Sequence, residues 1–252
     1  MRVSSRPGES LSPTGFTDEL RIGGKFTVEI DDPKIAALRE TVTAAQQEFD
    51  MAVTFHEVWK PAAYDSDLHS RLGKSYASQA FLIARVALRR EMVLALVRLW
   101  DTNKQAIRMK SVAATLRETE VTDALALDRA SRLGLLEVID EVRSDLERKA
   151  DEAGMLLNKY MEGGSHRAVL EKLLALRNER LAHRQLAPAT ATAADATDGE
   201  IEEFYQDNSK LISILLSLVN AMAYDPQDTA KVYRLYASHF WRSFQKTDNK
   251  MP

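Results

Sequence analysis

The feature of this chain that most constrains its fold is the lack of proline between Pro61 and Pro188. Because proline removes a helical hydrogen bond and clashes with the preceding turn, a segment without it permits long, uninterrupted helices. Large apolar residues recur along this segment at spacings of three and four, which is the pattern of helices with one buried face. We therefore predict an all-α fold, a bundle of about six to seven helices.

Capping signals divide this pattern into individual helices. Asp32 followed by Pro33 predicts a helix start, and the apolar stripe after it ends at Pro61. A second helix is expected over residues 67–101, with these side chains facing inward: Leu68, Leu72, Ile83, Val86, Val93, Val97 and Trp100. Further helices are expected at 111–116 after a Ser111 cap, from Thr122, from Leu135 to Gly163-Gly164, from a Ser165 cap through 173–184, at 200–223, and after Asp225-Pro226.

Two segments do not share the helical pattern. Serine, proline and glycine crowd the first fifteen positions, which is typical of a mobile tail, whereas Phe26, Val28 and Ile30 alternate as in a short strand. We therefore expect residues 1–31 to form an arm that is either β or disordered, followed by a single helical domain over 32–252. Residues 187–199 are rich in alanine, threonine and aspartate and predict an exposed loop.

Charge and residue usage exclude several classes of function. A net charge of −3 argues against a dedicated duplex-DNA binder, and the absence of cysteine excludes disulfides, cysteine-bound zinc and thiol catalysis. The histidines lack the His-Glu-x-x-His spacing of a zinc site, so we predict no metal and no cofactor. The longest apolar stretch, residues 211–223, is too short to span a bilayer, and the N-terminus lacks an apolar signal core. We expect a cytoplasmic protein without membrane contact.

The segment with the clearest chemical meaning is 177–183, which reads Arg-Asn-Glu-Arg-Leu-Ala-His. Arginine provides a permanently charged fork suited to a phosphate, and histidine transfers protons near neutral pH. Arg177 and His183 thus suffice in principle for cleavage of RNA without a metal, with the ribose 2′-hydroxyl as the nucleophile. Their six-residue spacing places them roughly 120° apart around an ideal helix. Either the helix loosens before His183, or a second copy of the helix completes the site across a two-fold axis.

The same residues also have a purely structural interpretation. Arginine and histidine are favoured in the last turn of any helix, where they meet exposed carbonyl groups and the negative end of the helix dipole. Glu179 and His183 form an ordinary i,i+4 pair, and Arg180 and Arg184 form a like-charged one. The spacing alone favours this structural interpretation.

Three other groups of residues have structural and functional interpretations. A basic strip is typical of a solvated helix face, with contact to an RNA backbone as the alternative; its members are Arg85, Arg89, Arg90, Arg98, Lys104, Arg108 and Lys110. A set of aromatic residues favours core or dimer packing over a base-stacking platform: Tyr233, Tyr236, Phe240, Trp241 and Phe244. His56 is expected to be a packing residue.

The arrangement of Arg177-Asn178 followed after four residues by His183 resembles the signature of the HEPN superfamily. The end of the second helix, 96–101, is also similar to the abortive-infection AbiU branch of that superfamily. The resemblance implies a helical homodimer whose two motifs meet in one cleft and cut single-stranded RNA without a metal. It also implies that Arg177 is the phosphate-binding residue, Asn178 a polar orienting residue and His183 the catalytic histidine. We further expect Arg180 and Arg184 to contact the RNA.

Two functions of different classes follow. The first is a metal-independent endoribonuclease in phage defence or toxin-like growth arrest, with RNA as its substrate and an inhibitor or antitoxin protein as a further partner. The second is a non-catalytic helical module that only mediates dimerisation or another interaction, with 211–223 and the aromatic last helix as its main surfaces. Cleavage of RNA in the presence of a chelator distinguishes the two.

Overall fold

The computed structural model describes residues 32–73, 77–101, 103, 106–177 and 196–243. Over these residues the chain forms nine α-helices, one short 3₁₀ helix and no β-strand, which confirms the all-α fold. The elements are α1 (Pro33–Tyr64), α2 (Ser66–Leu72), α3 (Ala77–Arg98), α4 (Met109–Thr115), α5 (Thr119–Leu133), η1 (Leu136–Val138), α6 (Ile139–Tyr160), α7 (Arg167–Leu176), α8 (Asp198–Asn220) and α9 (Pro226–Arg242). Among the described helices, none has the length and apolarity needed to cross a bilayer. The predicted arm at 1–31 lies outside the described residues.

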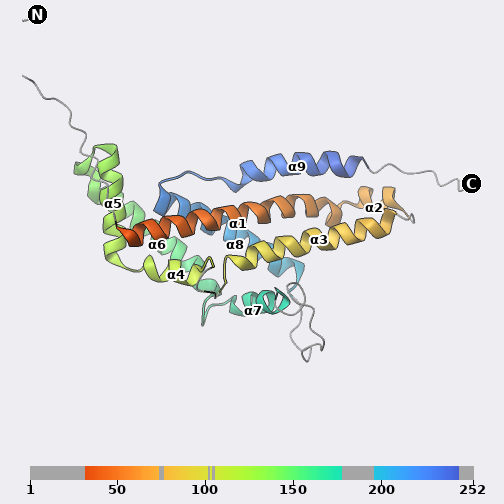
Figure 1. Ribbon diagram of the computed structural model, residues 1–252, viewed down its shortest axis with the longest axis horizontal. Coiled ribbons are helices and arrows are strands. Elements are labelled where there is room, and N and C mark those ends of the chain that lie inside the picture. Colours follow the sequence, from red (N-terminus) through yellow and green to blue (C-terminus); the bar gives the residue numbers. More distant parts are fainter. Residues whose placement is uncertain (1–31, 74–76, 102, 104–105, 178–195, 244–252) are drawn as a thin grey trace, which may run out of the picture.

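Helix α1 is the central element of the bundle. Figure 1 shows it along the long axis of the molecule, with α9 on one side and α3 on the other. It begins as predicted, because the side chain of Asp32 accepts a hydrogen bond from the Lys34 backbone and Pro33 occupies the first turn. The predicted end at Pro61 is wrong, since the helix continues to Tyr64. Pro61 lies in the last turn, and its carbonyl still accepts a bond from the backbone N–H of Asp65.

The predicted second helix is divided in two at Gly73. Helix α2 ends at Gly73, whose φ of 54° is incompatible with a continuing right-handed helix. Residues other than glycine rarely adopt this conformation. Five of the side chains predicted to face inward are buried, but Ile83 and Val86 are 71% and 66% exposed. Both lie in the first half of α3, on a side that no described helix covers, whereas Met92 to Val97 enter the core. Helical spacing identifies a shared face but not whether a neighbour covers it.

Other helix starts differ from the predictions by one to three residues. Helix α4 begins before Ser111, because the carbonyl of Arg108 already accepts hydrogen bonds from the backbone N–H groups of Ser111 and Val112. Helix α5 begins at Thr119 rather than Thr122, and α7 has His166 rather than Ser165 at its N-cap position. The helix expected from Leu135 is a 3₁₀ turn followed by α6.

The last two helices have strong N-terminal caps. A reciprocal capping box of Thr197 and Glu200 starts α8 at Asp198, so the predicted loop at 187–199 ends two residues earlier than expected. Helix α9 begins at Pro226, after an Asp225 cap, as predicted. These bonds are local in sequence, which is why α9 was predictable.

The buried apolar side chains form one large cluster and one small one. The large cluster joins α1 and α3–α9; its fully buried members include Phe49, Leu96, Leu146, Leu157, Phe204, Leu211 and Leu215. Burial of each such side chain contributes about 2 kcal/mol of hydrophobic stabilisation. The small cluster lies where α1, α2, α3 and α9 meet, and there the ring of Phe81 packs edge-on against Trp241.

The turn between α6 and α7 depends on Gly164. A β-carbon at this position would overlap the backbone carbonyl groups of Asn158 and Lys159. We expect Gly164→Ala to lower the free energy of unfolding by about 2–3 kcal/mol, because backbone rather than a mobile side chain would have to move. Chemical denaturation measures this change.

Gly154 in α6 is the matched control. Nothing lies within 4 Å of a β-carbon built there. Gly154→Ala should raise the free energy of unfolding by about 0.5–1 kcal/mol, because alanine favours the helix. If both variants are equally stable, the Gly164 turn does not require glycine.

Candidate functional site

Arg177 is the first residue of the 177–183 motif, and it directly follows α7. Helix α7 buries Val169, Leu170 and Leu173 against the bundle, which fixes the helix in place. Arg177 is the C-cap residue of α7 and keeps a helical backbone conformation, and its backbone N–H bonds to the carbonyls of Leu173 and Leu174. In Figure 1, α7 lies on the same side of α1 as α3. The end of α7 therefore presents Arg177 from a rigid support.

The guanidinium of Arg177 forms an ion pair with the carboxylate of Asp101. The distance from Nη1 to Oδ2 is 2.7 Å, and the two side chains are 19% and 21% exposed. A charged hydrogen bond that is partly shielded from water is stronger than an exposed one. This contact joins the end of α7 to the segment that follows α3.

Asp101 is itself held by contacts to the core. The indole N–H of the preceding Trp100 donates to Oδ1 of buried Asn208 in α8, over 2.9 Å. The start of α4 lies beside the end of α3, since the backbone N–H of Met109 bonds to the carbonyl of Leu99. The carboxylate of Asp101 accepts a hydrogen bond from Nη1 of Arg177 and so orients the guanidinium. Phosphate oxygens are acceptors for the same kind of donor.

The chain returns to the same region at the start of α8. Ala196 is buried, and the first turn of α8 is tied to two neighbouring helices. Asp198 pairs with Arg89 of α3, and Glu200 pairs with Lys172 of α7, each over 2.7 Å. The hydrogen bond from Lys172 and that from the Thr197 backbone lower the pKa of Glu200 to about 2. Residues on both sides of 178–195 are thus attached to α3 and α7.

Of the five predicted site residues, the structure places Arg177. The other four lie outside the described residues: Asn178, Arg180, His183 and Arg184. The contact between Arg177 and Asp101 was not predicted, although Arg177 was a predicted site residue and Asp101 ends the segment 96–101 that resembles the AbiU branch. The only signal for it was a lone acidic residue at the end of a basic helix.

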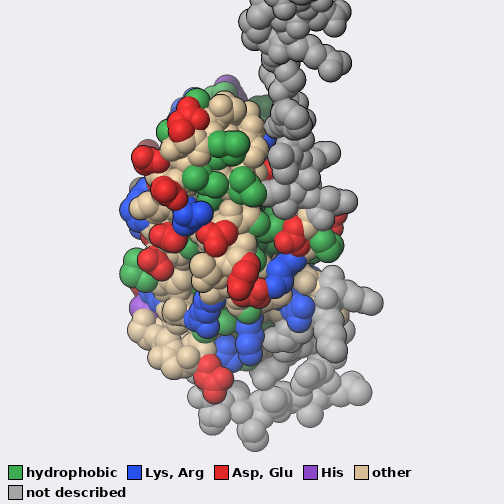
Figure 2. Space-filling view, turned by 90° about the vertical axis from the view of Figure 1, so that its left-hand side faces the viewer, with side chains coloured by type: hydrophobic (Ala, Val, Ile, Leu, Met, Phe, Trp, Pro, Cys, Tyr) green, Lys and Arg blue, Asp and Glu red, His purple; other side chains and the backbone are tan. Residues whose placement is uncertain are grey.

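Three of the seven members of the basic strip, all on α3, form ion pairs with acidic side chains. Arg89 pairs with Asp198 as above, and Arg98 pairs with Glu48 of α1 over 2.7 Å. These pairs favour the solvated helix face over an RNA track. Figure 2 views a different part of the surface, the end of the molecule nearest α5, where basic and acidic side chains both occur. Ion pairs of α5 and α6, such as Arg143 with Asp123, lie in this part of the bundle.

His56 is a packing residue, as predicted. It is 2% exposed, stacks on the ring of Tyr205 and bonds through Nε2 to Glu202 over 2.9 Å. Burial alone would lower the pKa of His56, but the bonds to Glu202 and Glu57 outweigh it and raise the pKa. Glu57 also pairs with Arg234 of α9. The cluster joins α1, α8 and α9.

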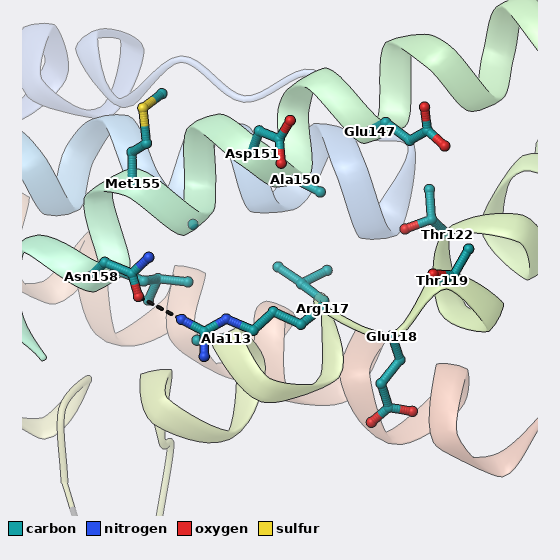
Figure 3. A pocket seen from close by; sticks show the side chains of 13 residues that line it. Ala113, Arg117, Glu118, Thr119, Thr122, Glu147, Ala150, Asp151, Met155 and Asn158 are labelled. Atoms are coloured by element: carbon teal, nitrogen blue, oxygen red, sulfur yellow. Dashed lines mark hydrogen bonds between the residues drawn. The ribbon is translucent and has the colours of Figure 1, made fainter.

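A groove of about 750 Å³ lies between the α4–α5 connection and α6. Figure 3 shows Arg117 bonded to Asn158 across it, with Glu118, Glu147 and Asp151 along its rim. Arg177 and Asp101 do not line this groove. Over the part of the chain that the structure describes, no group of three or more histidine and acidic side chains is placed to hold a metal ion.

Comparison with known proteins identifies one family. A family model described as AbiU2, of the HEPN type, matches residues 35–240. This match covers α1 through most of α9 and includes both Asp101 and the 177–183 motif. No curated protein and no solved structure match the chain.

Proposed function

Because the chain belongs to the AbiU2 family of HEPN domains, we propose that it is a metal-independent endoribonuclease. The observation that supports this proposal most is the position of Arg177 at the end of α7. Its guanidinium is oriented by Asp101 and only 19% exposed. A charged fork held in this way is suited to a phosphate of RNA, because little reorganisation is needed when the phosphate binds.

The reaction is a transfer of the phosphoryl group to the ribose 2′-oxygen. A bond forms between O2′ and phosphorus, and the bond from phosphorus to O5′ breaks, which leaves a 2′,3′-cyclic phosphate. His183 accepts the proton of the 2′-hydroxyl, and a histidine in its imidazolium form protonates the departing O5′. Arg177 stabilises the charge that develops on the phosphorus oxygens, and Asn178 orients the reacting group.

A second copy of the chain completes this site. Two proton-transfer steps are served by two histidines, and each chain has one His183 in its motif. The separation of about 120° between Arg177 and His183 on an ideal helix also favours a site shared across a two-fold axis. Arg180 and Arg184 would contact the RNA backbone. Cleavage of this kind suits phage defence or growth arrest, controlled by an inhibitor protein.

Incubation with labelled single-stranded RNA in the presence of EDTA tests the proposal. We expect cleavage that persists in the chelator and leaves 2′,3′-cyclic phosphate ends, because no step requires a metal. RNA in which 2′-deoxyribose replaces the ribose at the cut position should resist cleavage. Activity that is lost with EDTA and restored by Mg²⁺ would contradict the mechanism.

The second candidate is a helical interaction module without catalytic activity. The ion pair of Arg177 with Asp101 is also compatible with this candidate, since a contact between the end of α7 and the segment after α3 stabilises a bundle whether or not RNA binds. This candidate predicts no cleavage of any RNA in the same assay. It also predicts that Arg177→Ala changes thermal stability alone.

A further inference from the structure

Helix α9 buries two alanines, a proline and one tryptophan against the bundle and exposes four other large apolar side chains. Its buried side chains are Pro226, Ala230, Ala237 and Trp241, which recur on one face. The exposed large residues are Val232 (46%), Leu235 (55%), Tyr236 (60%) and Phe240 (52%). At about 100° per residue, these four form one continuous arc on the opposite side of the helix. We call them the α9 arc.

Apart from Trp241, these large apolar side chains are not placed as expected for a helix at the surface of a monomer. Such a helix normally turns its large apolar side chains toward the core and its small or polar ones toward water. Single exposed apolar residues are common, but four on one face within about two turns mark an interaction surface. Contacts to α1 already secure the other face: Arg234 pairs with Glu57, and the Trp241 indole donates to the carbonyl of Val58.

The charges at the two ends of α9 favour an antiparallel copy of the same helix as the occupant. The first turn carries Asp228, which also pairs with Lys231 of the next turn, and the last turn carries His239 and Arg242. An antiparallel copy of the same helix would place Asp228 of one chain near the basic turn of the other. With the two-fold axis near Leu235 and Tyr236, the aliphatic end of one arc meets the aromatic end of the other. A parallel arrangement would bring like charges together.

We infer that the α9 arc is a self-association surface, on which α9 of a second copy of this chain packs antiparallel. Figure 1 shows α9 along the side of α1 away from α3 and α7. The copy bound there is therefore not the one that completes the site at Arg177. Two different two-fold contacts on one chain generate an assembly larger than a dimer.

Cysteine cross-linking tests this surface directly, because the chain has no cysteine of its own. We expect Leu235→Cys to form a disulfide-linked dimer under mild oxidation. The control is Val86→Cys on α3, which is 66% exposed but lies outside the α9 arc. A cross-link at position 235 and none at 86 supports the inference. No cross-link at 235, or equal cross-linking at both, overturns it.

A charge placed in the arc gives a second, independent measurement. Leu235→Glu should at least halve the mass of the assembly in solution, because two carboxylates would meet near the two-fold axis. The substitution is at an exposed position, so the helical circular dichroism signal should not change. RNA cleavage, if present in the wild-type protein, should be retained, which separates this surface from the proposed active site. An unchanged mass overturns the inference.

Discussion

Replacing His183 by alanine is expected to slow RNA cleavage by about 10³-fold, because it removes the proton-transfer group from both halves of the shared site. Arg177→Ala should have an effect of about 10²–10³-fold, since the charge on the phosphorus oxygens would lose its stabilising donor. Arg177→Lys should restore only part of this loss, because an ammonium group is a point charge without the planar fork. Initial rates on a labelled single-stranded RNA measure all three.

Arg167→Ala is the matched control for Arg177→Ala. Arg167 belongs to the same helix, but it lies in the first turn and pairs with Glu171 on the surface of α7. The control variant should cleave RNA within about twofold of the wild-type rate, because an exposed pair of this kind contributes little. If His183→Ala cleaves as fast as the wild type, the catalytic assignment is wrong, whatever the effect at Arg177.

Asp101→Asn is expected to lower kcat by about tenfold, with a smaller effect on KM. The amide has nearly the shape of the carboxylate but no charge, so the Arg177 guanidinium would lose the charged contact of 2.7 Å that orients it. A small misplacement of a catalytic group costs rate more than binding. Asp101→Glu should recover part of the rate, since the longer carboxylate still reaches the arginine.

The double variant Asp101→Asn/Arg177→Ala separates positioning from a general effect on stability. If Asp101 acts through Arg177, the double variant should cleave no more slowly than Arg177→Ala alone, because the oriented group is already absent. Independent effects would multiply to a further tenfold loss. A loss of kcat that follows the fraction of unfolded protein in thermal melts would assign Asp101 a structural role only.

The candidate site was only partly predictable. The helix that leads to Arg177 follows from the apolar spacing of Val169, Leu170 and Leu173, which the sequence shows directly, whereas the end of α7 at Leu176 does not. Asp101 is 76 residues away along the chain, and no local pattern connects it to Arg177. The two meet because α3 and α7 pack together, and that packing depends on many weak contacts across the core.

Local physical chemistry determined the all-helical class and several helix starts. The caps at Asp32 and Asp225 act over two residues, so the sequence displays them completely. Only the tertiary structure decided which helical faces are covered: Val86 on α3 and Tyr236 on α9 are exposed, although both recur at the spacing of a buried stripe. A repeat of 3.6 residues shows which side chains share a face, but whether that face is buried depends on the neighbour that packs against it.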